Sequence, residues 1–252
     1  MRPILHIPHA SVAIPKKYRK DYLGGDACIE KENLNLCDLH TDTLFVSSAL
    51  PTIPLIFPYS RIFVDVERFR NAKEEIMASR GMGALYSRGH DLKPIRTLPN
   101  HEEQEAILLQ YYDPHHAKLT ELVDAQLAQH GKALIIDCHS FPSKRLPYED
   151  TNEKERPEIC IGTDSFHTPQ GIANKLIQSF KKMGYSTALN YPFSGSIIPL
   201  KHYQRDLRVM SVMLEIRRDL FTDETNGSKI FKFSSTQLDI IEALKKSYKP
   251  FY

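Results

Sequence analysis

The feature that most constrains the fold is an apolar run, Ala133–Ile136, that passes directly into the polar segment Asp137–Ser140. In an open α/β sheet, ligands bind just outside the carboxyl ends of the strands. Asp137 and His139 are two residues apart, so along a strand their side chains point to the same face. The pattern fits a catalytic or metal-binding histidine beside a carboxylate. It fits equally well a half-buried strand that ends in a hydrogen-bonded histidine.

Two other apolar runs are also followed by a residue that can act in catalysis or bind a metal ion. Val209–Leu214 runs straight into Glu215, and Ile4–Ile7 is followed by His9. An ionised glutamate behind a buried strand is costly unless it is paired. Because the carboxyl ends of parallel strands meet at one edge of a sheet, the three runs together predict a cluster of His9, His139 and Glu215.

Strands and helices alternate along the rest of the chain. Strands are predicted at residues 4–7, 52–57, 62–66, 133–138, 159–162 and 209–214. Pro54 places the second of these at a sheet edge or in an irregular position. Helices are predicted at residues 33–50, 101–130 with an interruption near 113–114, 169–183 and 234–248, and long loops at 70–100 and 142–157. This order favours a single α/β domain over residues 1–252, with a mixed, mostly parallel sheet flanked by helices.

The composition argues against several classes of protein. Hydrophobic residues make up 41% and charged residues 25% of the 252 residues, as in an ordinary globular domain. The apolar runs are far shorter than the ~20 residues of a membrane span, and no apolar leader opens the sequence, so we expect a cytoplasmic protein with no membrane partner. The net charge of +2 comes without a dense basic stretch, which argues against a nucleic-acid partner. Four scattered cysteines predict free, mostly buried thiols, and nothing indicates the oligomeric state.

Asp38 and Asp42 offer the carboxylate that two histidines would need to hold a metal ion. Both lie in the predicted helix 33–50, where their i, i+4 spacing puts them on one face. Carboxylates near a helix start also favour the helix dipole, which is a purely structural role. Alternatively, one of them completes a site with His9 and His139, because two histidines, one carboxylate and a water form a recurring catalytic zinc site.

Two arginines flank the predicted strand 62–66. Arg61 and Arg68 stand near its ends, and guanidinium groups bind substrate carboxylates in bidentate fashion. Most other histidines lie in predicted loops or on polar helix faces. A surface or helix-capping role is expected for His90, His101, His115, His116, His130, His167 and His202.

Five short blocks, taken in order, resemble the N-formylglutamate amidohydrolase family. They are Pro8–Ser11, Asp38–Asp42, Ser60–Arg68, Asp137–Ser140 and Leu214–Leu220. Each block alone is weakly specific, but the five in order are specific, and they cover nearly the whole chain up to about residue 222. That family resembles zinc carboxypeptidases in fold, so the resemblance implies a zinc-carboxypeptidase-like α/β domain.

The resemblance also implies a ligand set and a reaction. His9 and His139 would be ligands of one zinc ion and Glu215 the general base. Asp38 matches the aspartate at the helix start of the broader family and would be the carboxylate ligand, with Asp42 as its rival. The implied reaction is metal-assisted hydrolysis of an amide bond.

The implied substrate is a small N-acylated acidic amino acid, first of all N-formyl-L-glutamate, which would yield formate and glutamate as in histidine degradation. Arg61, Arg68 and Arg218 would bind its carboxylates. Glu67 and Arg217 depart from the family pattern, because many members carry Asn at the first position and some carry Asn at the second. Two alternatives stay open: a metallo-carboxypeptidase or peptide amidase with the same centre, and a non-catalytic binding protein on this scaffold.

Overall fold

The fold is built on one six-stranded sheet, in a computed structural model that describes residues 1–149 and 155–248. The strands are β1 Ile4–Ile7, β2 Ile53–Ile56, β3 Ala133–Phe141, β4 Ile159–Gly162, β5 Thr187–Leu189 and β6 Val209–Arg217. Their order in the sheet is β2-β1-β3-β6-β4-β5. Neighbours run parallel except β4 and β6, which are antiparallel. The predicted mixed, mostly parallel sheet is confirmed, and β2, which contains Pro54, lies at an edge.

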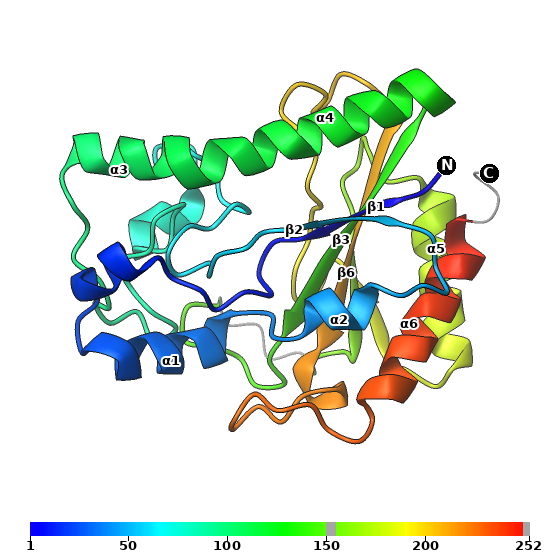
Figure 1. Cartoon of the computed structure of the whole chain (residues 1–252). Coiled ribbons are helices and arrows are strands. Elements are labelled where there is room, and N and C mark those ends of the chain that lie inside the picture. The colour runs from blue at the N-terminus through cyan, green and yellow to red at the C-terminus, as the bar shows by residue number, and fades with distance from the viewer. Residues whose placement is uncertain (150–154, 249–252) are drawn as a thin grey trace.

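Helices cover both faces of this sheet (Figure 1). They are α1 Gly25–Leu36, α2 Thr41–Phe45, α3 His101–Ile107, α4 Asp113–His130, α5 Gln170–Lys182 and α6 Phe233–Tyr248. α2, α5 and α6 share one core with apolar residues of β1, β3, β4 and β6. α4 lies on the other face, where Leu119 and Val123 cluster with Ile135 of β3.

The alternation of side chains along the strands decides which residues face the candidate site. Ile136 and Cys138 of β3 belong to the core beneath α2, α5 and α6. Asp137 and His139 therefore point to the opposite face, beyond the stretch that α4 covers. The register pairs His139 with Glu215 of β6, which places that carboxylate on the same face.

The predicted helix 33–50 is wrong, because the chain forms α1 and α2 with a break between them. His40, in the break, has a φ of 68°, which a right-handed helix does not allow. The amide of Asp38 donates to the carbonyl of His9 at 2.8 Å. Asp38 and Asp42 therefore do not share one helix face, and the break itself brings Asp38 next to His9.

The predicted strand 62–66 is also wrong, since these residues form consecutive turns. The amides of Phe63 and Val64 both donate to the carbonyl of Ser60. Their side chains are nevertheless buried, in an apolar cluster outside the sheet that includes Tyr86. A short apolar run identifies a buried segment but does not by itself distinguish a strand from a turn.

The remaining elements follow the sequence closely. The predicted interruption of helix 101–130 is a π-helical turn, Leu108–Tyr112, between α3 and α4. The loop at 70–100 contains one short 3₁₀ helix, Ile76–Arg80, and the expected loop at 142–157 includes residues 150–154, which lie outside the described residues. The short edge strand β5 was not predicted. All four cysteines are free, and none of the described helices is long and apolar enough to cross a membrane.

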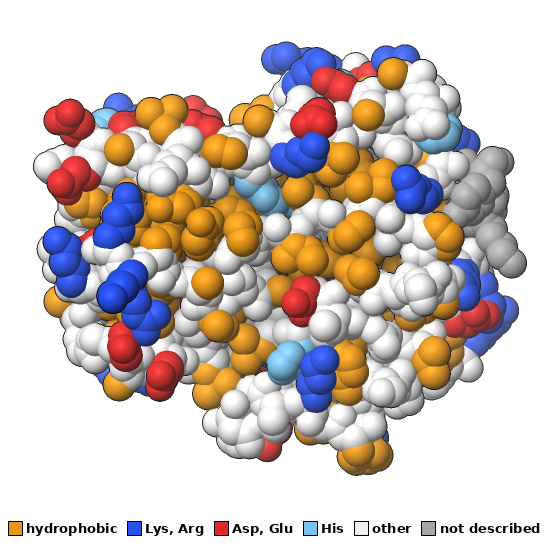
Figure 2. Space-filling view, in the orientation of Figure 1, with side chains coloured by type: hydrophobic (Ala, Val, Ile, Leu, Met, Phe, Trp, Pro, Cys, Tyr) orange, Lys and Arg blue, Asp and Glu red, His pale blue; other side chains and the backbone are white. Residues whose placement is uncertain are grey.

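The surface seen from the direction of Figure 1 carries mixed charge. Figure 2 shows basic and acidic side chains interspersed around a central area where hydrophobic side chains gather. This face therefore offers no single-sign field for a highly charged partner.

Candidate metal centre

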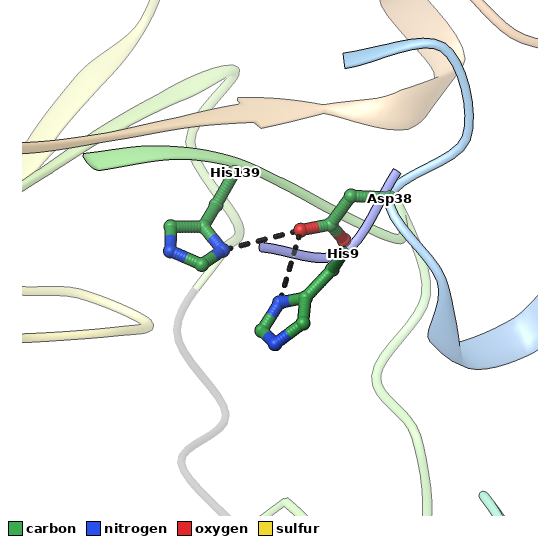
Figure 3. Close-up of side chains that lie close together, drawn as sticks. All are labelled: His9, Asp38 and His139. Atoms are coloured by element: carbon green, nitrogen blue, oxygen red, sulfur yellow. Dashed lines mark hydrogen bonds and ion pairs between the residues drawn. The ribbon is translucent and has the colours of Figure 1, made fainter. Parts of the chain in front are cut away.

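His9, Asp38 and His139 meet where β1 and β3 end (Figure 3). Oδ2 of Asp38 lies 3.5 Å from Nδ1 of His9 and 3.2 Å from Nδ1 of His139. All three side chains are buried. Asp42 lies apart on α2, where its carboxylate accepts a hydrogen bond from the amide of Thr43. The structure thus brings together two histidines and one carboxylate, a donor set that suits a divalent cation.

The far side of each histidine ring faces a second carboxylate. Nε2 of His9 lies 2.8 Å from Oδ1 of Asp65, and Nε2 of His139 lies 3.0 Å from Oδ1 of Asp137. A histidine that donates its Nε2–H to a carboxylate keeps an Nδ1 lone pair for a metal, as metal-bound histidines commonly do. Nδ1 of His9 is buried and has no hydrogen-bond partner within residues 1–149 and 155–248. This orphaned nitrogen fits a metal ligand.

The charges around the cluster favour a cation at this point. Burial alone would raise the pKa of Asp38, but the hydrogen bond with His139 and the proximity of His9 hold it well below its usual range. Oδ1 of the same carboxylate accepts a hydrogen bond from Arg218 at 3.1 Å. Burial alone would lower the pKa of His139, but the charge of Asp137 holds it well above its usual value. The charge of Asp137 therefore stabilises positive charge at the His139 ring.

Glu215 stands beside His139 and is only 6% exposed. Its Oε2 atom is buried and has no hydrogen-bond partner in the described part of the chain. Burial, together with the negative charge of Asp38, raises the pKa of Glu215 to about 8, although the charges of His139 and Arg218 oppose the rise. A carboxyl group with such a pKa is suited to accept and return a proton near neutral pH.

Two of the three predicted substrate arginines hold carboxylates of this cluster. Arg61 donates from Nε and Nη2 to Oδ2 of Asp65, at 3.1 and 2.8 Å. Arg218 donates to Asp38 and also to the main-chain carbonyl of Asn35. Both guanidinium groups therefore orient protein carboxylates and bring positive charge to the site.

Arg68 and Glu67 line a cavity of about 310 Å³ next to the cluster. Arg68 donates to the main-chain carbonyls of Met82 and Glu67. Oε1 of the Glu67 carboxylate lies 3.0 Å from Nδ1 of His6 and 3.8 Å from Nε2 of His139. Glu67 thus belongs to the buried charge network of the site.

Sequence reasoning assigned no role to Asp65 or His6, and only a surface or helix-capping role to His115. Nδ1 of His6 lies 2.8 Å from Asp137, and its Nε2 lies 2.9 Å from Nε2 of His115. Burial and the nearby His6 lower the pKa of His115 to about 2. The alternation within β1 was the signal for His6, because it places that ring on the face opposite Leu5. The expected surface role is wrong for three histidines, which are buried: His115, His167 and His202.

Comparison with known proteins assigns the chain to a family. Residues 1–222 match the model of the FGase family, N-formylglutamate amidohydrolase. The chain belongs to this family. Among curated proteins, N-formylglutamate deformylase of Pseudomonas aeruginosa is 27% identical over 202 residues, which cover 77% of this chain and 74% of that protein. The family resemblance seen in the five sequence blocks is confirmed.

Solved structures show the same fold. The structure of N-formylglutamate amidohydrolase from Ralstonia eutropha matches that of this chain with a TM-score of 0.82 at 20% identity. The match covers 97% of this chain and 93% of the Ralstonia chain. A gene product of Agrobacterium tumefaciens matches with a TM-score of 0.70 at 19% identity, covering 99% and 90%. At these identities the likeness supports the fold, and function has to be argued from the site.

Proposed function

We propose that this protein is a zinc-dependent amidohydrolase that removes the acyl group from a small N-acyl acidic amino acid, with N-formyl-L-glutamate as the leading substrate. The observation that carries the proposal is the convergence of His9 Nδ1, His139 Nδ1 and Asp38 Oδ2 beside Glu215. Membership of the amidohydrolase family, with a curated relative named a deformylase, supports the substrate. When bound, zinc would polarise the scissile carbonyl and make water a competent nucleophile near neutral pH.

The residues of the chain would divide the work of hydrolysis. Glu215 takes a proton from the attacking water and returns it to the leaving amine, so the C–N bond breaks and one water is consumed. The positive charge of Arg61 stabilises the oxygen on which negative charge develops. Arg68, which lines the cavity, and Arg218, which donates to Asp38, supply positive potential for the substrate carboxylates.

The cavity of about 310 Å³ that Glu67 and Arg68 line is not lined by the proposed ligands or by Glu215, so its volume does not measure the space for a substrate at the cluster. A metallo-carboxypeptidase or peptide amidase would need room for several residues of a peptide. These activities are therefore outcomes of the functional test below.

The function is tested with N-formyl amino acids and short peptides, each assayed with added zinc and after chelation. We expect release of formate from N-formyl-L-glutamate, and no release once the chelator has removed the metal. Release of carboxyl-terminal residues without deformylation would show a peptidase instead. A protein that holds stoichiometric zinc and cleaves nothing in the panel would be a binding protein.

Exchanging Asp65 for asparagine is expected to weaken zinc binding by about 10- to 100-fold, the usual effect of removing a carboxylate that orients a histidine ligand. Asn offers its carbonyl in place of one carboxylate oxygen, but the negative charge that favours the His9 tautomer is lost. Competition with a chromophoric chelator measures the affinity.

Asp124→Asn is the matched control for this exchange. Asp124 also accepts from a histidine, at 2.8 Å from Nε2 of His202, but it does so outside the cluster. We expect its zinc affinity to equal that of the wild type. Equal affinities for the Asp65 variant and the wild type would remove Asp65 from the metal centre.

A further inference from the structure

We propose that Arg156 anchors a carboxylate of the substrate through the Nε–Nη2 edge of its guanidinium group. The inference rests on the proposed function, because it names the residue that recognises the acid part of an N-acyl amino acid. The Arg156 side chain is 8% exposed. Its Nη1 contacts Oε2 of Glu149 at 2.5 Å, whereas Nε and Nη2 have no hydrogen-bond partner among residues 1–149 and 155–248.

The open edge has the geometry that carboxylates require. Nε and Nη2 form a planar fork whose spacing matches the two oxygens of a carboxylate. Among the described residues, three other arginines use this edge to bind both oxygens of an aspartate: Arg70 with Asp113, Arg208 with Asp206, and Arg217 with Asp219. Buried donors without partners are unfavourable, because they have lost the hydrogen bonds of water. A bound carboxylate would satisfy both donors of Arg156 at once.

Arg156 packs on the strand that carries His139. Its carbon Cζ lies 5.0 Å from the ring centre of Phe141 and 5.9 Å from that of Phe193. Phe141 is two residues beyond His139 on β3, so both side chains project to the same face, about 7 Å apart along the strand. That spacing suits a substrate whose amide is at the metal and whose carboxylate lies a few bonds away.

The neighbouring strand places Arg156 near Glu215 as well. Cys160 of β4 pairs with Glu215 in the register of β4 and β6. Burial raises the pKa of the Cys160 thiol to about 12, and the charges of Glu215 and Arg156 act on it in opposite directions. Sγ of Cys160 also contacts the carbonyl of Phe193, one of the two rings beneath Arg156. Arg156 and the proposed general base therefore both lie close enough to Cys160 for their charges to act on its thiol.

Other arginines do not combine an open edge with this position. Arg61 and Arg218 already bind aspartates of the cluster, and Arg68 donates to main-chain carbonyls. Arg96 has the same two unpartnered donors as Arg156 and is also buried. However, Arg96 stacks on Tyr22 and Phe63, which lie outside the sheet. Arg96 is therefore the matched control for Arg156.

Arg156→Lys keeps the positive charge and removes the fork. We expect the KM for N-formyl-L-glutamate to rise by about 10- to 100-fold, with a smaller change in kcat and unchanged zinc content, because hydrogen bonds to a carboxylate are lost. Arg96→Lys should leave the KM at the wild-type value. An unchanged KM in a folded Arg156→Lys protein, or an equal rise in both variants, would overturn the anchor.

Two further substrates identify which carboxylate is bound. N-formyl-L-glutamine lacks the side-chain carboxylate, and N-formyl-4-aminobutyrate lacks the α-carboxylate. If Arg156 binds the α-carboxylate, the exchange to lysine raises the KM for the glutamine compound and leaves that for the aminobutyrate compound unchanged. If it binds the side-chain carboxylate, the two responses are reversed.

Direct binding separates the anchor from the proposed function. Titration with glutarate, a dicarboxylate of the same chain length as glutamate, measures anion binding by calorimetry without turnover. If the wild type hydrolyses no N-formyl compound, the proposed function fails, but glutarate binding that weakens in Arg156→Lys and not in Arg96→Lys still supports the anchor. Should the lysine variant not fold, wild-type crystals soaked with glutarate decide: density on the Nε–Nη2 edge supports the anchor, and glutarate bound elsewhere contradicts it.

Discussion

Replacing Glu215 with glutamine is expected to lower kcat by about 10²- to 10⁴-fold, the usual contribution of a general base, while zinc content stays at the wild-type level. Glutamine has the same shape but does not accept the proton of the attacking water. The buried Oε2 of Glu215 has no hydrogen-bond partner within the described residues, so the exchange breaks no contact of that atom. The measurements are kcat on N-formyl-L-glutamate and elemental analysis of the same samples.

Glu32→Gln provides the control for this prediction. Glu32 is as buried as Glu215, with 2% exposure against 6%, but its carboxylate binds His90 away from the metal cluster. We expect the folded Glu32 variant to keep the kcat of the wild type. Near-normal turnover of the Glu215 variant would mean that another group takes the proton.

The candidate site was largely predictable because three strands reveal it independently. The runs that end in His9, His139 and Glu215 each combine an apolar segment with a polar terminus, and parallel strands bring such termini to one edge. The boundaries were less accurate, since β3 and β6 continue through His139 and Glu215. The alternation of side chains still places Asp137 and His139 on one face of β3, whichever residue is taken as the last of the strand.

The parts that could not be predicted depend on backbone conformation and tertiary contacts. The apolar residues of 33–50 have helical spacing, but the left-handed conformation of His40 breaks the helix. Asp65 reaches His9 because the apolar segment before it folds into turns. Arg156 packs on Phe141, two residues beyond His139 on β3. The sequence positions of Asp65 and Arg156 do not indicate their contacts with His9 and Phe141.

Removing one ligand of the cluster is expected to abolish metal binding at the micromolar level and activity with it. His139→Ala and Asp38→Ala should each weaken zinc binding by more than about 100-fold, because losing a ligand costs more than the 10- to 100-fold typical of its hydrogen-bonded partner. Asp42→Ala should bind zinc like the wild type, since the Asp42 carboxylate caps Thr43 and lies outside the cluster. Chelator competition on all three variants measures the affinities.

The comparison of the two aspartate variants decides between the rival carboxylates. Both exchanges remove one negative charge near the start of α2, so a general loss of electrostatic attraction would affect them similarly. A direct ligand is distinguished by geometry, and Oδ2 of Asp38 is the oxygen that both Nδ1 atoms face. Zinc loss in Asp42→Ala with retention in Asp38→Ala would identify Asp42 as the ligand and would require α2 to move toward His139.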